Sequence, residues 1–115
     1  MNKTLYQQQE YLKKFINSCN SRKPLCLDYQ YPHHIITKDR DKAIKFMKQK
    51  NATPIAIGKK YCEWRLNEEI WVWKQYNQRE RGIRFFQIVI DKDIDFEFLD
   101  WVMIASYYCF SAEAF

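Results

Sequence analysis

Glycine and proline are scarce in this sequence, and their scarcity excludes several kinds of site. Only Gly58 and Gly82 occur among 115 residues, so the chain has no glycine-rich phosphate loop and no Gly-x-Ser-x-Gly nucleophile elbow. Three prolines and an apolar share of 47% argue against a disordered or low-complexity chain. We therefore expect one compact domain that covers residues 1–115.

Long hydrophobic runs are absent as well. The longest uncharged stretch, residues 101–112, is too short to span a bilayer, and no N-terminal segment has the pattern of a signal peptide. Four cysteines occur without a Cys-x-x-Cys pair, which favours free thiols over a zinc site or a disulfide framework. These features predict a cytoplasmic protein without a membrane partner, metal or other cofactor.

Positive charge predominates, but it is unevenly distributed. The net charge is +5, with +7 in residues 1–50, +3 in residues 51–90 and −5 in residues 91–115. A basic body with an acidic tail is compatible with a polyanionic partner, although many basic surfaces bind no polyanion.

The hydrophobic periodicity predicts an α+β domain with helices packed on a mostly antiparallel meander of four to five strands. Amphipathic spacing indicates helices at residues 4–20, 38–50 and 95–109. Alternating or apolar runs bounded by turns indicate strands at residues 25–31, 54–57, 61–66, 70–76 and 83–90. Two to three helices and the strands follow the order α-β-α-β-β-β-β-α.

Both histidines lie in the segment "YPHHII", residues 31–36. In an extended chain His33 and His34 would point to opposite sides, so they could not ligate one metal ion together. We therefore expect a loop after Pro32 and no metal site at the histidines. The carboxylates of "DKDIDFE", residues 91–97, lack the glycine and glutamate of an EF-hand loop and are typical of a helix start.

The meander predicts which side chains share a face of the sheet. If Asn67 and Glu68 form a two-residue turn, Trp64 pairs with Trp71. If residues 77–82 then join antiparallel strands, Trp73 faces Phe86. The predicted inner face is Cys62, Trp64, Leu66, Trp71, Trp73, Phe86, Ile88 and Ile90. The predicted outer face is Tyr61, Glu63, Arg65, Val72, Lys74, Tyr76, Phe85 and Gln87.

The outer face combines aromatic, basic and amide side chains, which is the composition by which sheets stack unpaired bases and neutralise phosphates. The candidate binding residues are Tyr61, Arg65, Lys74, Tyr76, Arg79, Arg81, Phe85 and Gln87. They favour a non-catalytic protein that binds RNA, single-stranded DNA or a nucleoprotein. The composition is equally typical of an inhibitor or adaptor, of phage or mobile-element type, that docks on a host protein. A small basic ribonuclease using Arg79, Arg84, Tyr76 and His34 is a third interpretation, without a supporting motif. The sequence does not indicate the oligomeric state.

Overall fold

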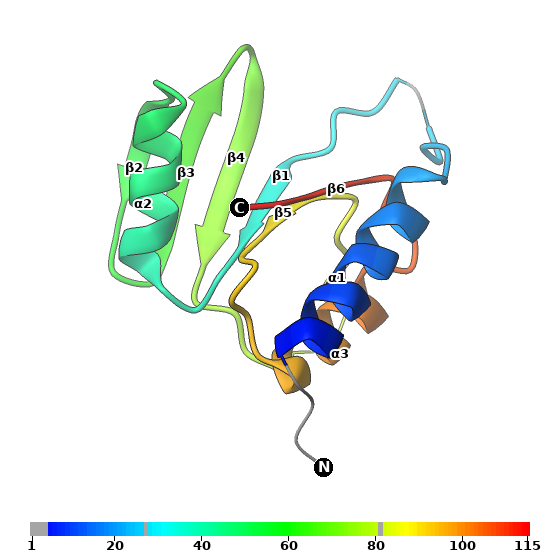
Figure 1. Cartoon of the computed structure of the whole chain (residues 1–115). Coiled ribbons are helices and arrows are strands. Elements are labelled where there is room, and N and C mark those ends of the chain that lie inside the picture. Colours follow the sequence, from blue (N-terminus) through cyan, green and yellow to red (C-terminus); the bar gives the residue numbers. More distant parts are fainter. Residues whose placement is uncertain (1–4, 27, 81) are drawn as a thin grey trace.

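A computed structural model describes residues 5–26, 28–80 and 82–115, which form a single α+β domain (Figure 1). Its elements are α1 (Leu5–Asn20), β1 (His33–Ile36), α2 (Arg40–Gln49), β2 (Thr53–Ile57), β3 (Tyr61–Leu66), β4 (Glu69–Lys74), β5 (Gln87–Ile90), α3 (Phe96–Ala105) and β6 (Ser111–Ala114). The predicted fold class and the order of elements through α3 are confirmed. The short strand β6 follows α3 and was not predicted. None of the helices in these ranges is both long enough and apolar enough to cross a membrane.

The six strands form one mixed sheet in the order β2-β3-β4-β1-β5-β6. Strands β2, β3 and β4 form the first three strands of the predicted antiparallel meander, and Trp64 pairs with Trp71 as expected. Asn67 and Glu68 have φ angles of 51° and 67°, as a two-residue hairpin turn of type I′ requires. Strand β1 lies between β4 and β5 and is parallel to both, and β6 is parallel to β5.

The position of β1 corrects two predictions. The strand expected at residues 25–31 lies at His33–Ile36, so the histidines are in the middle of the sheet and not in a loop. A central parallel strand is buried on both faces and therefore shows an apolar run, here Ile35 and Ile36, instead of an alternating pattern. The second error follows from the first: β5 pairs with β1, so Trp73 and Phe86 do not face each other.

Helix α2 packs on the face that carries the tryptophans of the meander. The helix begins at Asp39, whose side chain accepts hydrogen bonds from the backbone N–H groups of Asp41 and Lys42. Phe46 lies 6.5 Å from the Trp71 ring. The Trp73 indole N–H donates to the Thr37 carbonyl oxygen at 2.8 Å, so the hairpin is tied to the end of β1. The predicted burial of Cys62, Trp64, Trp71 and Trp73 is confirmed.

Helices α1 and α3 lie against the other half of the sheet (Figure 1). The Asn20 side chain both donates to and accepts from the backbone of Ala112 in β6, which closes that edge of the sheet. The face of β3 and β4 opposite α2 remains exposed or half-buried. We call it the uncovered face; it consists of Tyr61, Glu63, Arg65, Ile70, Val72 and Lys74.

Candidate functional site

The structure divides the predicted binding residues into two groups. Tyr61 and Arg65 are exposed on the uncovered face, and Lys74 is half-buried beside them. Tyr76 and Phe85 are buried and pack against Trp101 of α3, with ring centroids 6.3 and 5.8 Å away. Neither ring can stack on a base from solvent, which corrects their placement on an open surface.

The burial of Phe85 has a physical cause in the chain path. Because β1 occupies the place beside β4, the segment before β5 turns under α3, and the Phe85 N–H donates to the Ala105 carbonyl oxygen at 2.9 Å. Gln87 is also displaced from its predicted face. It lies in register with His33 and Trp71 at the amino end of β5.

The basic residues among the predicted binding residues differ in exposure and in whether a carboxylate pairs with them. The Lys74 ammonium pairs with the Glu80 carboxylate at 2.8 Å and lies 5.9 Å from the Tyr76 ring. Arg79 is exposed, and Arg81 lies outside the described residues. Arg65 has no salt-bridge partner within the part of the chain that the structure describes. Arg79 has none either, but only Arg65 of the two lies on the uncovered face, so Arg65 is the predicted cation best placed to meet a ligand there.

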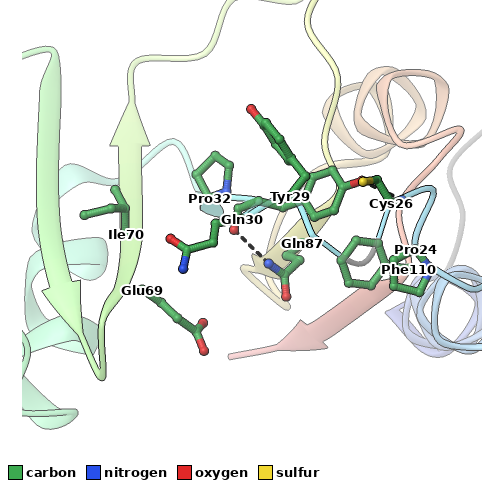
Figure 2. Close-up of a pocket in the computed structure, with 10 residues that line it drawn as sticks. Pro24, Cys26, Tyr29, Gln30, Pro32, Glu69, Ile70, Gln87 and Phe110 are labelled. Carbon is green, nitrogen blue, oxygen red and sulfur yellow. Dashed lines mark hydrogen bonds between the residues drawn. The ribbon is translucent and has the colours of Figure 1, made fainter.

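A cleft of about 570 Å³ opens where β4, β1 and β5 begin, and we call it the amino-end cleft (Figure 2). Its volume is within the usual range for small-molecule sites. The lining residues come from the segment before β1, the start of β4, the start of β5 and the approach to β6: Pro24, Cys26, Tyr29, Gln30, Tyr31, Pro32, Glu69, Ile70, Gln87 and Phe110.

Tyr31 lies at the centre of a group of aromatic rings at the amino-end cleft. Its ring lies 4.7 Å from that of Tyr29, 4.7 Å from that of Phe86 and 5.2 Å from that of Phe110. Its hydroxyl accepts a hydrogen bond from the Cys26 N–H at 3.1 Å. Tyr29 is 61% exposed, so its ring remains accessible from solvent.

Glu69 brings a carboxylate to the cleft and contacts Nε2 of His33. The His33 ring is stacked on Trp71 with centroids 4.2 Å apart and planes inclined by 7°. Burial lowers the pKa of His33 below its usual value, and the Glu69 carboxylate offsets part of that effect. His33 is therefore neutral near pH 7.

His34 points to the other side of β1, so the expectation that the two histidines diverge is confirmed. It lies 5.0 Å from Phe85 and 6.5 Å from Tyr76, measured between ring centroids. Burial, the nearby Lys74 charge and His33 lower the pKa of His34 to about 4. Tyr76 is buried, and burial raises the pKa of its hydroxyl. His34 and Tyr76 therefore do not form an accessible acid and base pair.

A second cleft, of about 520 Å³, lies at the carboxyl ends of β1 and β4, and we call it the carboxyl-end cleft. Its lining is mainly polar: Lys38, Lys60, Gln75, Tyr76, Asn77, Gln78, Glu80 and Phe98. Lys38 pairs with Asp95 at 2.7 Å, whereas Lys60 has no ion-pair partner within the described ranges. The carboxyl ends of parallel strands are a common position for ligands in α/β sheets.

The acidic run at residues 91–97 has a structural role. Asp95 caps α3 by accepting a hydrogen bond from the Phe98 N–H at 2.9 Å. Asp91 is buried, accepts from the Thr37 hydroxyl at 2.7 Å and contacts the Lys42 ammonium. Burial alone would raise the pKa of Asp91, but these hydrogen bonds hold it below its usual value. Among the described residues, no three His, Cys, Asp or Glu side chains are grouped to hold a metal ion.

Comparison with known proteins gives no assignment. No family model and no curated protein matches the chain. Among solved structures, the large terminase from a thermophilic bacteriophage aligns at 8% identity with a TM-score of 0.46. The alignment covers 98% of this chain and 30% of the terminase chain. This likeness is too weak to support an argument about function.

Proposed function

We propose that this protein binds single-stranded nucleic acid, without catalysing a reaction, in the amino-end cleft and along the uncovered face of β3 and β4. The observation that carries the proposal is the junction of these two surfaces at Ile70. Ile70 lines the cleft and pairs in register with Arg65, so a guanidinium without an ion-pair partner among the described residues lies beside an aromatic pocket. Stacking rings next to unpaired cations are how proteins hold single strands without regard to sequence.

The uncovered face extends the proposed binding surface away from the cleft. Ile70, Val72 and Lys74 alternate along β4 over roughly 13 Å, given a strand rise of about 3.3 Å per residue. The backbone of a bound strand would pass Arg65 first and then approach Lys74. Lys23, which is exposed and directly precedes Pro24 of the cleft, supplies a further cation at the opposite end.

The charge distribution supports the same partner. Residues 1–90 carry a net charge of +10. A field of this sign raises the rate of encounter with polyanions, most strongly at low ionic strength.

A salt titration with a fluorescently labelled single-stranded 12-mer tests the proposal. We expect micromolar binding at low salt and a linear fall of log K with log salt. Arg65→Ala should weaken binding several-fold and reduce the slope of that line by about 0.7, the value for one phosphate contact on a single strand. Lys45→Ala is the matched control, because Lys45 is exposed on α2, on the other side of the sheet.

Two outcomes would refute the proposal. One is the absence of binding at micromolar protein in low salt. The other is an equal effect of Arg65→Ala and Lys45→Ala on affinity and slope, because net charge alone would then explain the binding.

A docking protein is the second candidate, and the edge of the sheet favours it. Strand β2 is exposed along its whole length, and its Ile55 and Ile57 side chains remain 49% and 46% exposed. An open strand edge with apolar side chains can pair with a strand of a partner. Binding that hardly responds to salt and is lost in Ile57→Lys would support this candidate over the first.

A further inference from the structure

The polar side chains of the amino-end cleft include Gln87, Glu69 and Gln30. One N–H of the Gln87 amide donates to the Tyr31 carbonyl oxygen at 2.8 Å, which leaves its second N–H and its amide oxygen for a ligand. One oxygen of Glu69 contacts His33, and the other has no donor within the described residues. Figure 2 shows Gln30 and Glu69 on the β4 side of Gln87, with Pro24 and Phe110 on the opposite side.

We propose that the amino-end cleft holds one unpaired base and selects a base that carries an exocyclic amino group. This inference rests on the proposed function and names the feature of the nucleic acid that the cleft would read. The amide oxygen of Gln87 and the free oxygen of Glu69 are the selecting atoms, and Tyr29 is the accessible stacking ring.

The selection follows from the donors that the bases carry. Adenine, cytosine and guanine each have an amino group, which can donate to a carboxylate or to an amide oxygen. An amino group has two N–H bonds and can donate to both selecting oxygens at once, whereas uracil has a single N–H and leaves one of them without a donor. An acceptor that loses its water to the bound base without gaining a donor is costly, so uracil should be disfavoured. The second N–H of Gln87 and the exposed amide of Gln30 can donate to a ring nitrogen or carbonyl oxygen of each of the four bases, so these donors do not distinguish them.

Labelled oligo(C), oligo(A) and oligo(U) 12-mers, compared at one salt concentration, test the selection. All three carry the same phosphate charge, so the electrostatic part of binding is matched. We expect oligo(C) and oligo(A) to bind at least 10-fold more tightly than oligo(U). Tyr29→Ala should weaken binding of all three by about 5-fold or more through lost stacking.

Two variants identify the selecting atoms. Glu69→Gln replaces a pure acceptor by a group that can also donate, and it should lower the preference for oligo(C) over oligo(U) at least 3-fold. Glu68→Gln is the control: it removes the same charge from the neighbouring turn residue, which does not line the cleft, and should leave the preference unchanged. Gln87→Met, which keeps the side-chain length without an acceptor, should lower the preference as well.

The outcomes separate this inference from the proposed function. If the protein binds all three oligonucleotides equally well, the inference is wrong and the proposed function stands. Equal changes of preference in Glu69→Gln and Glu68→Gln would also overturn the inference. If no oligonucleotide binds, both the inference and the proposed function fail.

Discussion

The stability of the fold should depend on pH through His34. The pKa of His34 is about 4 in the folded protein, whereas a solvated histidine, such as that of the unfolded chain, has a pKa of 6.5. Below pH 6.5 the unfolded chain therefore takes up a proton that the folded protein does not, and stability falls as the pH falls towards 4. A difference of one between two pKa values corresponds to about 1.4 kcal/mol, so the full loss is roughly 3 kcal/mol.

Most of this loss should appear between about pH 7.5 and pH 5, where linkage gives about 2 kcal/mol for His34 alone. The lowered pKa of His33 acts in the same direction, whereas Asp91 and Asp95, whose pKa values lie below 3.8, lose their contribution only at lower pH. The measurement is urea unfolding at both pH values for the wild type and for His34→Leu, with the midpoint and slope fitted at each pH.

The difference between the two proteins isolates His34. His34→Leu should lose about 2 kcal/mol less than the wild type across that pH interval, because leucine does not titrate. Equal losses would contradict the reasoning, as would an unshifted folded-state pKa for His34 in an NMR titration of its ring.

Two further predictions concern the core. Trp73→Ala should destabilise the fold by about 3 to 5 kcal/mol, the range for truncating a large buried aromatic, and the Thr37 carbonyl would lose its indole donor. Denaturant unfolding checks this, with Tyr107→Ala at an exposed position as the control. A near-neutral result for Trp73→Ala would disprove the burial of Trp73. All four cysteines should be reduced: a thiol reagent should modify exposed Cys26 quickly in the folded protein and find four groups after denaturation. Fewer than four, without prior oxidation, would contradict this.

The part of the fold that local rules determine could be predicted from the sequence. A two-residue turn fixes the register of a hairpin, so placing the turn at Asn67 and Glu68 was enough to pair Trp64 with Trp71. The helices followed from amphipathic spacing. Each of these features depends on residues close together in the chain.

The parallel pairings could not be predicted in the same way. No turn joins β1 to β4 or to β5, because parallel neighbours need long connections whose geometry the local sequence does not specify. The prediction extended the correct faces of the hairpin through residues 77–82 to β5. Phe85 was consequently expected on an open face, although it lies under α3.

The amino-end cleft had almost no signal in the sequence. Its lining residues come from four segments that meet only after the parallel strands are in place. The alternation that includes Tyr29 and Tyr31 was visible, but it predicted a strand. Gln87 was identified as a binding residue for a face on which it does not lie. Arg65 was correctly expected on an exposed face, because its position is set by the hairpin register alone.

The central place of β1 also determines the order in which the chain can fold. Both neighbours of β1 are synthesised after it, since His33 pairs with Trp71 on one side and with Gln87 on the other. The pairing of β3 with β4 joins residues close together in the chain and can form in microseconds, whereas β1 must wait for two long loops to close. Until β5 arrives, one side of β1 exposes unpaired N–H and C=O groups next to Ile35 and Ile36. This interval is when a second copy of the chain could add a strand, so aggregation should compete with folding most strongly before the C-terminal quarter is available.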